Sequence, residues 1–274
     1  MSSQTGSGEQ LVDQWRRLPP LARNISTASF VLSVLCYTGF VGMWRVFWDT
    51  GYITKFPPEV WRFITSFLIT NPQFGIILDP YFLYMYLSEL ERGNSRFPRR
   101  EDLVWYLIFV STTMVAVTEL AWRYTPLLSG PYPAFISGLI MSLCYTVHQD
   151  QRGRMASFIF FTVPAQLVPY LMIVFSFIMG NLYIIPLQII GLLIAHAWDF
   201  GRRLWPEFAG GRVLLPTPGW VSYLIDTPRV LRRDYGAVYT PSSGAQPSTG
   251  SSTGADRGPL PESWKSRGPG RRLG

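Results

Sequence analysis

The sequence has little charge, only two cysteines and almost no lysine. Charged residues make up 15% of the 274 residues, whereas a typical soluble domain carries about 25%. Cys36 and Cys144 both lie in apolar stretches, which excludes a small secreted scaffold held together by disulfides. The net charge of +7 comes from arginine, since Lys55 and Lys265 are the only lysines. A freely soluble enzyme and a fully disordered chain are both disfavoured.

The basic residues are distributed in a way that argues against nucleic-acid binding. An isoelectric point near 9.6 often indicates such binding. Here the arginines fall between apolar segments, and this spacing is typical of membrane topology. We therefore expect a lipid bilayer as the surrounding medium and no nucleic acid as a partner.

Apolar segments of membrane-spanning length dominate the first 200 residues. A spanning helix needs about 20 predominantly apolar residues. Four segments meet this length, and two more lie near its lower limit: 25–44, 103–122, 155–179 and 181–200, with 73–90 and 133–148 as the shorter pair. The shorter pair can also be interpreted as re-entrant or buried segments. Counting all six, the sequence predicts an all-α integral membrane protein folded as a six-transmembrane helical bundle.

The arginines also predict the orientation of the bundle, because Lys and Arg are enriched in cytoplasmic loops near span ends. The N-terminal segment, every second connection and the segment after span six hold most of them: Arg16, Arg17, Arg23, Arg92, Arg96, Arg99, Arg100, Arg152, Arg154, Arg202, Arg203 and Arg212. Both termini are therefore expected in the cytosol. The first 24 residues are polar and no small-residue cleavage site follows span one, so we expect a signal anchor rather than a cleaved signal peptide.

Four parts follow from this pattern. Residues 1–24 form a cytosolic amphipathic segment, 25–200 the membrane domain, 201–238 a cytosolic juxtamembrane segment, and 239–274 a tail. The tail is rich in Gly, Ser and Pro and cannot bury enough apolar surface to fold, so we expect it to be disordered.

Two segments of the membrane domain depart from simple spans. The first luminal loop, 45–72, is rich in aromatic residues, which favour the bilayer interface; it can equally be a luminal cap folded over the bundle. Within it, residues 59–68 predict a short amphipathic helix. In span five, Pro164 and Pro169 predict a kink, because proline removes a backbone donor and clashes with the preceding turn.

Several motifs, in order along residues 11–222, resemble one family. They are QWRRLPPLARN at the N-terminus, VWRFITSF with the pair Trp61 and Arg62, DPYFLYMYLSELERG, LIMSLCYTVHQDQ, IIGLLIAHAWDFGRRLWPEF, and GGRVLLPTPGWV. Together they resemble the derlin family, the rhomboid-like pseudoproteases of the endoplasmic reticulum membrane, and we expect a fungal-type member. The resemblance implies a rhomboid-like bundle with its termini in the cytosol.

The resemblance also allows the protease positions to be compared. Rhomboid proteases use a serine of a Gly-x-Ser-Gly turn in span four and a histidine in span six. This chain keeps Ser137 but has Gln188 at the histidine position, and glutamine cannot act as the base that a serine nucleophile needs. His196 lies about 12 Å further along the helix, so a dyad with Ser137 is disfavoured. We expect His196 to pair with Asp199 instead, and we expect a proteolytically inactive protein.

Small residues in span six predict close helix packing. Gly191 and Ala195 occupy a small-xxx-small pattern, which lets two helix backbones approach closely. We expect this helix to pack at the centre of the bundle against span two or span four.

The end of the tail, GPGRRLG, resembles the derlin box that recruits the AAA ATPase valosin-containing protein. The residues involved would be Trp264, Gly268, Gly270, Arg272 and Leu273. The family box has an aromatic residue directly before its first glycine, whereas this chain has Arg267 there. The alternative is an ordinary Arg/Gly tail that binds nothing specific.

The resemblance implies a non-catalytic factor of endoplasmic-reticulum-associated degradation. Such a factor recognises misfolded proteins of the endoplasmic reticulum and helps their retrotranslocation, with a membrane ubiquitin ligase complex and the ATPase as partners and with homo- and hetero-oligomers both open. The short spans two and four predict local membrane thinning. The alternatives are an active rhomboid-type serine protease using Ser137, and a channel or transporter. No residue spacing indicates a metal site, and we expect no cofactor.

Overall fold

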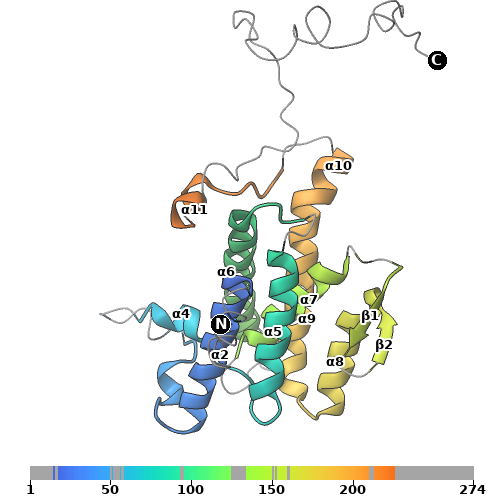
Figure 1. The fold of residues 1–274 in the computed structure, drawn as a ribbon. Helices are drawn as coiled ribbons and strands as arrows, with labels where there is room; N and C mark the ends of the chain where they lie inside the picture. Colours follow the sequence, from blue (N-terminus) through green and yellow to red (C-terminus); the bar gives the residue numbers. More distant parts are fainter. Residues whose placement is uncertain are drawn as a thin grey trace, which may run out of the picture. The chain divides into compact units, whose positions relative to one another are not determined.

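The computed structural model is mainly helical (Figure 1). It describes residues 15, 18–49, 51, 56, 59–92, 96–124, 134–149, 151, 153–158, 161–209 and 213–225. The longer helices are α2 (Pro20–Tyr37), α5 (Gly75–Glu91), α6 (Arg100–Tyr124), α7 (Ile136–Gln149), α8 (Val168–Ile178) and α9 (Ile185–Asp199). The shorter helical elements are η1 (Met43–Arg45), α4 (Trp61–Thr65), η3 (Ala165–Leu167), η4 (Leu182–Ile184), η5 (Phe200–Leu204), α10 (Trp205–Ala209) and α11 (Gly219–Leu224). Two strands, β1 (Met155–Phe158) and β2 (Phe161–Pro164), pair antiparallel.

Helix α7 is the centre of the core. All its residues from Ile136 to His148 are buried, which a helix achieves only when it is apolar or small on every face and enclosed by others. Polar side chains on it bond locally or to neighbours: Tyr106 of α6, for example, donates to the Ser142 carbonyl at 3.0 Å and lies 2.8 Å from the Thr146 hydroxyl. The core therefore forms around α7.

Polar contacts tie several helix ends together at one end of the bundle. Glu91, in the last turn of α5, accepts hydrogen bonds from the backbone N–H groups of Leu21 and Ala22 at 3.1 and 2.9 Å. These two donors belong to the first turn of α2, where backbone N–H groups lack helical partners. At the end of α9, Asp199 forms an ion pair with Arg96, just before α6, at 2.9 Å. The start of α2 thus lies at the end of α5, and Arg96, in the connection to α6, lies at the end of α9.

Each of the six predicted spans overlaps one of the longer helices, but the boundaries differ. The first helix begins at Pro20 and ends at Tyr37, not at residue 44, because the chain turns at Gly39, whose φ of +84° is accessible to glycine. The last helix continues past residue 200 through the π-helical turn η5 into α10. In the first loop, the predicted helix over 59–68 shortens to α4.

The prediction for span five was wrong in its first half. Residues 155–158 and 161–164 form a two-stranded hairpin rather than helix, so the fold is not purely α. Pro164 ends β2, and Pro169 lies in the first turn of α8, where a missing N–H costs nothing. The predicted proline kink is therefore absent from α8. The hairpin packs beside this helix, with Phe158 at 6.2 Å from Phe175 between ring centres (Figure 1).

In the part of the chain that the structure describes, two helical stretches are long and apolar enough to cross a membrane, Arg100–Tyr124 and Leu182–Phe208. Ala165–Ile178 is apolar but shorter.

Candidate functional site

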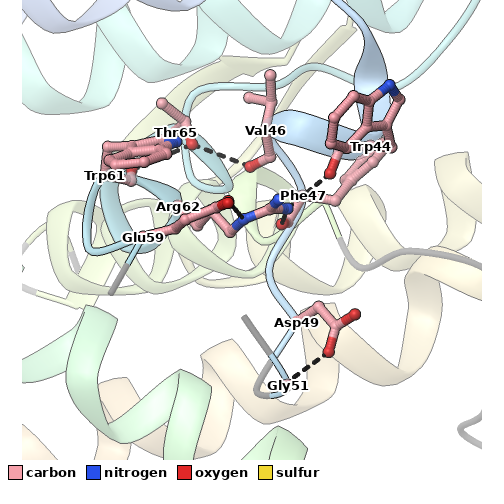
Figure 2. A network of polar contacts seen from close by, with 9 residues as sticks. All are labelled: Trp44, Val46, Phe47, Asp49, Gly51, Glu59, Trp61, Arg62 and Thr65. Carbon is pink, nitrogen blue, oxygen red and sulfur yellow. Dashed lines mark hydrogen bonds and ion pairs between the residues drawn. The ribbon is translucent and has the colours of Figure 1, made fainter. Parts of the chain in front are cut away.

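Arg62, of the Trp-Arg pair, organises the first loop from a buried position (Figure 2). Only 1% of its surface is exposed. Its Nη1 donates to the carbonyl oxygens of Trp44 and Phe47 at 2.6 and 2.9 Å, and its Nε donates to Glu59 at 2.5 Å. A guanidinium has donors in a fixed fork, so one side chain fixes the two halves of the loop relative to each other. The neighbouring Thr65 hydroxyl adds a bond to the Val46 carbonyl at 2.9 Å.

The loop has a buried aromatic face and an exposed one. On the buried face, ring contacts run from Trp48 through Phe63 and Phe67 to Phe135, with the last pair stacked at 5.0 Å. The Trp48 indole also donates to Glu119 of α6 at 2.6 Å. The exposed face carries large apolar side chains: Trp44, Phe56, Val60, Trp61 and Ile64. The loop therefore packs onto the bundle as a cap does, while the outer face presents the surface expected of an interfacial segment.

Ser137 and Gln188 line one cavity of about 270 Å³. Ser137 lies in the first turn of α7, and its hydroxyl accepts a hydrogen bond from the Asn71 side-chain amide at 2.8 Å. Gln188 lies in the first turn of α9 and donates through Nε2 to the Ser176 hydroxyl of α8 at 2.8 Å. Both residues are 4% exposed. The two protease-like positions are therefore brought together, each with an amide or hydroxyl partner.

Both histidines lie away from this cavity within the described residues. The His148 Nδ1 lies 2.8 Å from the Cys144 carbonyl oxygen at the far end of α7. His196 is on an exposed position of α9, with Nδ1 at 2.8 Å from the Tyr145 hydroxyl. The predicted pairing of His196 with Asp199 was wrong, because Asp199 faces inward and binds Arg96. His196 and Asp199 are three residues apart in α9, but the Asp199 carboxylate forms its ion pair with Arg96.

Gly191 lies where α9 crosses α7. A Cβ atom at this position would lie 2.9 and 3.0 Å from the carbonyl carbon and Cα of Gly138, which is inside ordinary contact distance. The Ser142 hydroxyl bonds both backbones, at 2.7 Å to the Gly191 carbonyl oxygen and 3.0 Å to that of Gly138. Ala195, one turn further, is also buried. The small-xxx-small residues of α9 therefore face α7, the fourth predicted span.

The segment with Thr217 and Trp220 lies against α6. Asp102 accepts hydrogen bonds from the Thr217 hydroxyl and from Arg202, the latter at 2.6 Å. The Trp220 ring meets Trp105 edge to face, with ring centres 6.0 Å apart. These contacts attach residues beyond the last long helix to the start of α6.

Residues 18–219 match the sequence model of the Der1-like family. The chain belongs to the Der1-like family. Human Derlin-1 is 29% identical to it over 212 residues, which cover 75% of this chain and 79% of the human protein. Derlin-1 of Drosophila melanogaster is 24% identical over 216 residues, or 77% and 82% of the two chains. Derlin-1 of Arabidopsis thaliana is 26% identical over 215 residues, or 77% and 76%.

The resemblance to the derlin family is thus confirmed, and this Der1-like chain is a membrane protein. The matched range contains Arg62, Ser137, Gln188 and Gly191. It excludes the C-terminal box, whose residues also lie outside the described part of the chain: Trp264, Gly268, Gly270, Arg272 and Leu273.

Sequence reasoning missed several partners of these residues. The sequence did not indicate a role for Asn71, because a single asparagine in a loop is common. Asp79 was visible as an isolated acid in an apolar stretch, yet only the structure shows that it accepts two bonds at 2.8 Å from the backbone and side chain of Asn71. Gly138 follows Ser137 in the sequence, and nothing in that position indicates that its backbone meets Gly191. Within the described residues, no group of three or more His, Cys, Asp or Glu side chains could hold a metal.

Proposed function

We propose that this derlin-family chain is a non-catalytic factor of endoplasmic-reticulum-associated degradation. It recognises misfolded luminal or membrane proteins and assists their retrotranslocation to the cytosol. The observation that carries the non-catalytic part is the pairing of Ser137 with the Asn71 amide at 2.8 Å. The second protease-like position in the same cavity holds Gln188. An amide is not a base at neutral pH, so nothing in this pairing activates the hydroxyl.

A fluorophosphonate probe tests this part directly. The purified full chain in detergent should remain unlabelled under conditions that label an active rhomboid protease in the same tube. The matched control is Ser137→Ala, which should give the same background. Labelling that disappears in Ser137→Ala would mean that the chain is a serine protease.

The lengths of α5 and α8 suggest how the protein lowers the free-energy barrier for a client chain that crosses the bilayer. The 11 residues of α8 span about 17 Å and the 17 residues of α5 about 26 Å at 1.5 Å per residue, against about 30 Å of hydrocarbon. Both present exposed apolar side chains, such as Ile77 and Phe177. A short lipid-facing helix is accommodated by local thinning of the bilayer. Helix α7 is shorter than α5 but enclosed, so α8, rather than span four, joins span two as the source of mismatch.

Thinning matters because a charged side chain at the bilayer centre costs about 2.5–3.5 kcal/mol on insertion scales. A shorter apolar path lowers that cost for a polar chain in transit. The exposed aromatic face around Trp61 adds an interfacial surface. The experiment is a pulse-chase of a misfolded membrane client in cells. Trp61→Ala should slow the loss of the client. The control is Phe208→Ala, which changes an exposed residue of α10 and should leave the loss unchanged. Unchanged turnover in Trp61→Ala would remove the loop from the mechanism.

We also propose that both termini lie in the cytosol and that the chain resides in the endoplasmic reticulum. The contacts of Glu91 with the start of α2 and of Arg96 with Asp199 at the end of α9 support one cytosolic face. Glycosylation acceptor sites added at each terminus should remain unmodified, and a site placed in the loop at residue 56 should be modified. Modification of either terminus would contradict this topology.

The tail is proposed to recruit the AAA ATPase, in concert with a membrane ubiquitin ligase complex. Affinity purification of the full chain and of a chain lacking residues 264–274 separates the two partners. Loss of the ATPase alone supports the box, whereas unchanged recovery assigns the tail to no specific partner.

A further inference from the structure

The cavity beside Ser137 has an unusual composition for the interior of a membrane bundle. It is formed where α5, α7 and α9 begin and α8 ends, and exposed residues such as Phe74 and Met179 lie at its rim. Its polar lining consists of one acid and six neutral residues: Asp79, with Asn71, Gln73, Ser137, Ser176, Asn181 and Gln188. Among the described residues that line it there is no Lys, Arg or His. The cavity therefore contains an acid and several neutral polar groups without a cation.

The hydrogen bonds among the buried cavity residues leave one acceptor, the Gln188 Oε1 atom, without a partner. Both side-chain N–H groups of Asn71 are engaged, one with Asp79 and one with Ser137. Gln188 donates to Ser176, and Ser176 donates onward to the Met172 carbonyl oxygen at 3.0 Å. The Gln188 Oε1 atom is buried and has no hydrogen-bond partner within the described residues. The buried Gln188 Oε1 atom can therefore accept a hydrogen bond from a group that enters the cavity.

Asp79 contributes a carboxylate to the acceptors of the cavity. Its Oδ2 accepts from the backbone and side chain of Asn71, and in the described part of the chain no basic residue forms an ion pair with it. Ionisable residues within membrane segments pair with one another or mark a functional site. Because no basic partner for Asp79 is found among the described residues, a ligand is a natural source of the positive charge.

The remaining walls suit a cation with an apolar stem. Phe82, Phe158 and Phe175 line the cavity, and aromatic faces attract ammonium and guanidinium groups. The volume of about 270 Å³ is below the range of about 300–1,000 Å³ for drug-sized ligands. It fits a single long side chain better than a whole small molecule.

We propose that this cavity receives a basic side chain, best a lysine, from a transmembrane segment of a client protein. The ammonium donates to the Gln188 Oε1 atom and the Asp79 carboxylate, and the methylene stem packs against the phenylalanines. A lysine within a spanning helix is costly in lipid, so the cavity selects segments that are unstable in the bilayer. This inference rests on the proposed function for the identity of the client, and only the chemistry of the cavity is new.

The test measures binding of a synthetic transmembrane peptide to the full chain in phosphatidylcholine nanodiscs. One peptide carries a lysine one turn from its luminal end, and its matched partner carries norleucine there. The lysine peptide should bind about tenfold more tightly, as expected for a charge-assisted hydrogen bond. Gln188→Leu and Asp79→Asn should each abolish most of that preference, while Asp49→Asn, an exposed acid outside the cavity, should retain it.

The outcomes separate the proposal from its rivals. Equal binding of the two peptides to the wild-type chain overturns it, and so does a lysine preference that survives both Gln188→Leu and Asp79→Asn. Loss of the preference when phosphatidylethanolamine is added would assign the cavity to a lipid ammonium, which also overturns it. Thermal unfolding in the same nanodiscs shows that the variants are folded; Gln188→Leu should be at least as stable as wild type because it removes an unsatisfied buried acceptor.

This binding test stands apart from the proposed function. If a client without basic transmembrane residues is degraded normally in cells that lack the protein, the degradation role fails, whatever the peptides do. If that client is stabilised but the peptides bind equally, only the cavity assignment fails.

Discussion

Replacing Gly191 by alanine is the sharpest test of how α7 and α9 pack. The added Cβ would lie 2.9 and 3.0 Å from the carbonyl carbon and Cα of Gly138 and closer still to its carbonyl oxygen. Carbon atoms in contact prefer about 3.5–4.0 Å, so the helices must separate by about 0.5–1 Å. No rotamer relieves this clash, because the atoms on both sides are backbone.

The cost has two parts. Overpacking of this kind costs about 1–3 kcal/mol. Separation also stretches the 2.7 Å bond from the Ser142 hydroxyl to the Gly191 carbonyl oxygen, and an interhelical hydrogen bond in a membrane protein is worth about 0.6 kcal/mol on average. We expect Gly191→Ala to lose about 2–4 kcal/mol, which corresponds to about 4–16 °C in the unfolding midpoint at about 2–4 °C per kcal/mol.

The assay is thermal unfolding of the purified chain in detergent, followed by circular dichroism, with steady-state accumulation in cells as a second readout. Gly219→Ala is the matched control, since a Cβ there meets no atom within 4 Å. Ser142→Ala should lose only the smaller, hydrogen-bond part. If Gly191→Ala unfolds at the same temperature as Gly219→Ala, the close crossing of α7 and α9 is refuted.

Two further predictions concern single polar contacts. Arg62→Ala removes two charge-assisted hydrogen bonds to the carbonyl oxygens of Trp44 and Phe47, each worth about 1.5–3 kcal/mol. Unfolding should occur several degrees lower than in the exposed Arg45→Ala, and equal midpoints would contradict the role of Arg62. Asp102→Ala removes the acceptor shared by Thr217 and Arg202, so limited proteolysis should cut residues 213–225 faster than in the wild type. An unchanged cleavage rate would show that the Trp105–Trp220 contact is sufficient to hold this segment against α6.

The sequence was informative wherever one physical constraint dominates. Long apolar stretches limit the chain to helices that satisfy their own backbone, so the region of each long helix could be predicted. Gly191 and Ala195 could likewise be identified because their spacing places both on one helix face. Their partner could not, because Gly138 meets Gly191 only after two helices 50 residues apart have packed.

Span five shows where this reasoning failed. MASFIFFTVP is apolar throughout, and an apolar run does not by itself distinguish helix from strand. Its aromatic and β-branched residues fit a strand, and Pro164 terminates the hairpin instead of bending a helix. The two bonds of the Arg62 Nη1 atom could not be predicted either, since their acceptors are backbone carbonyl groups, which every residue possesses.

The packing site and the cavity depend on each other. Ser137 precedes Gly138 in α7, and Gln188 comes one turn before Gly191 in α9, so the close crossing at the two glycines holds the two cavity residues near one another. A larger residue at either glycine would separate the helices and widen the cavity that Asp79 and the Gln188 Oε1 atom share. Burying an acceptor without a partner costs about 1–3 kcal/mol, and an aliphatic residue at position 188 would avoid that cost. The bond to Ser176 accounts for the Nε2 group of Gln188, whereas its buried Oε1 atom is accounted for by a group that enters from outside and donates to it.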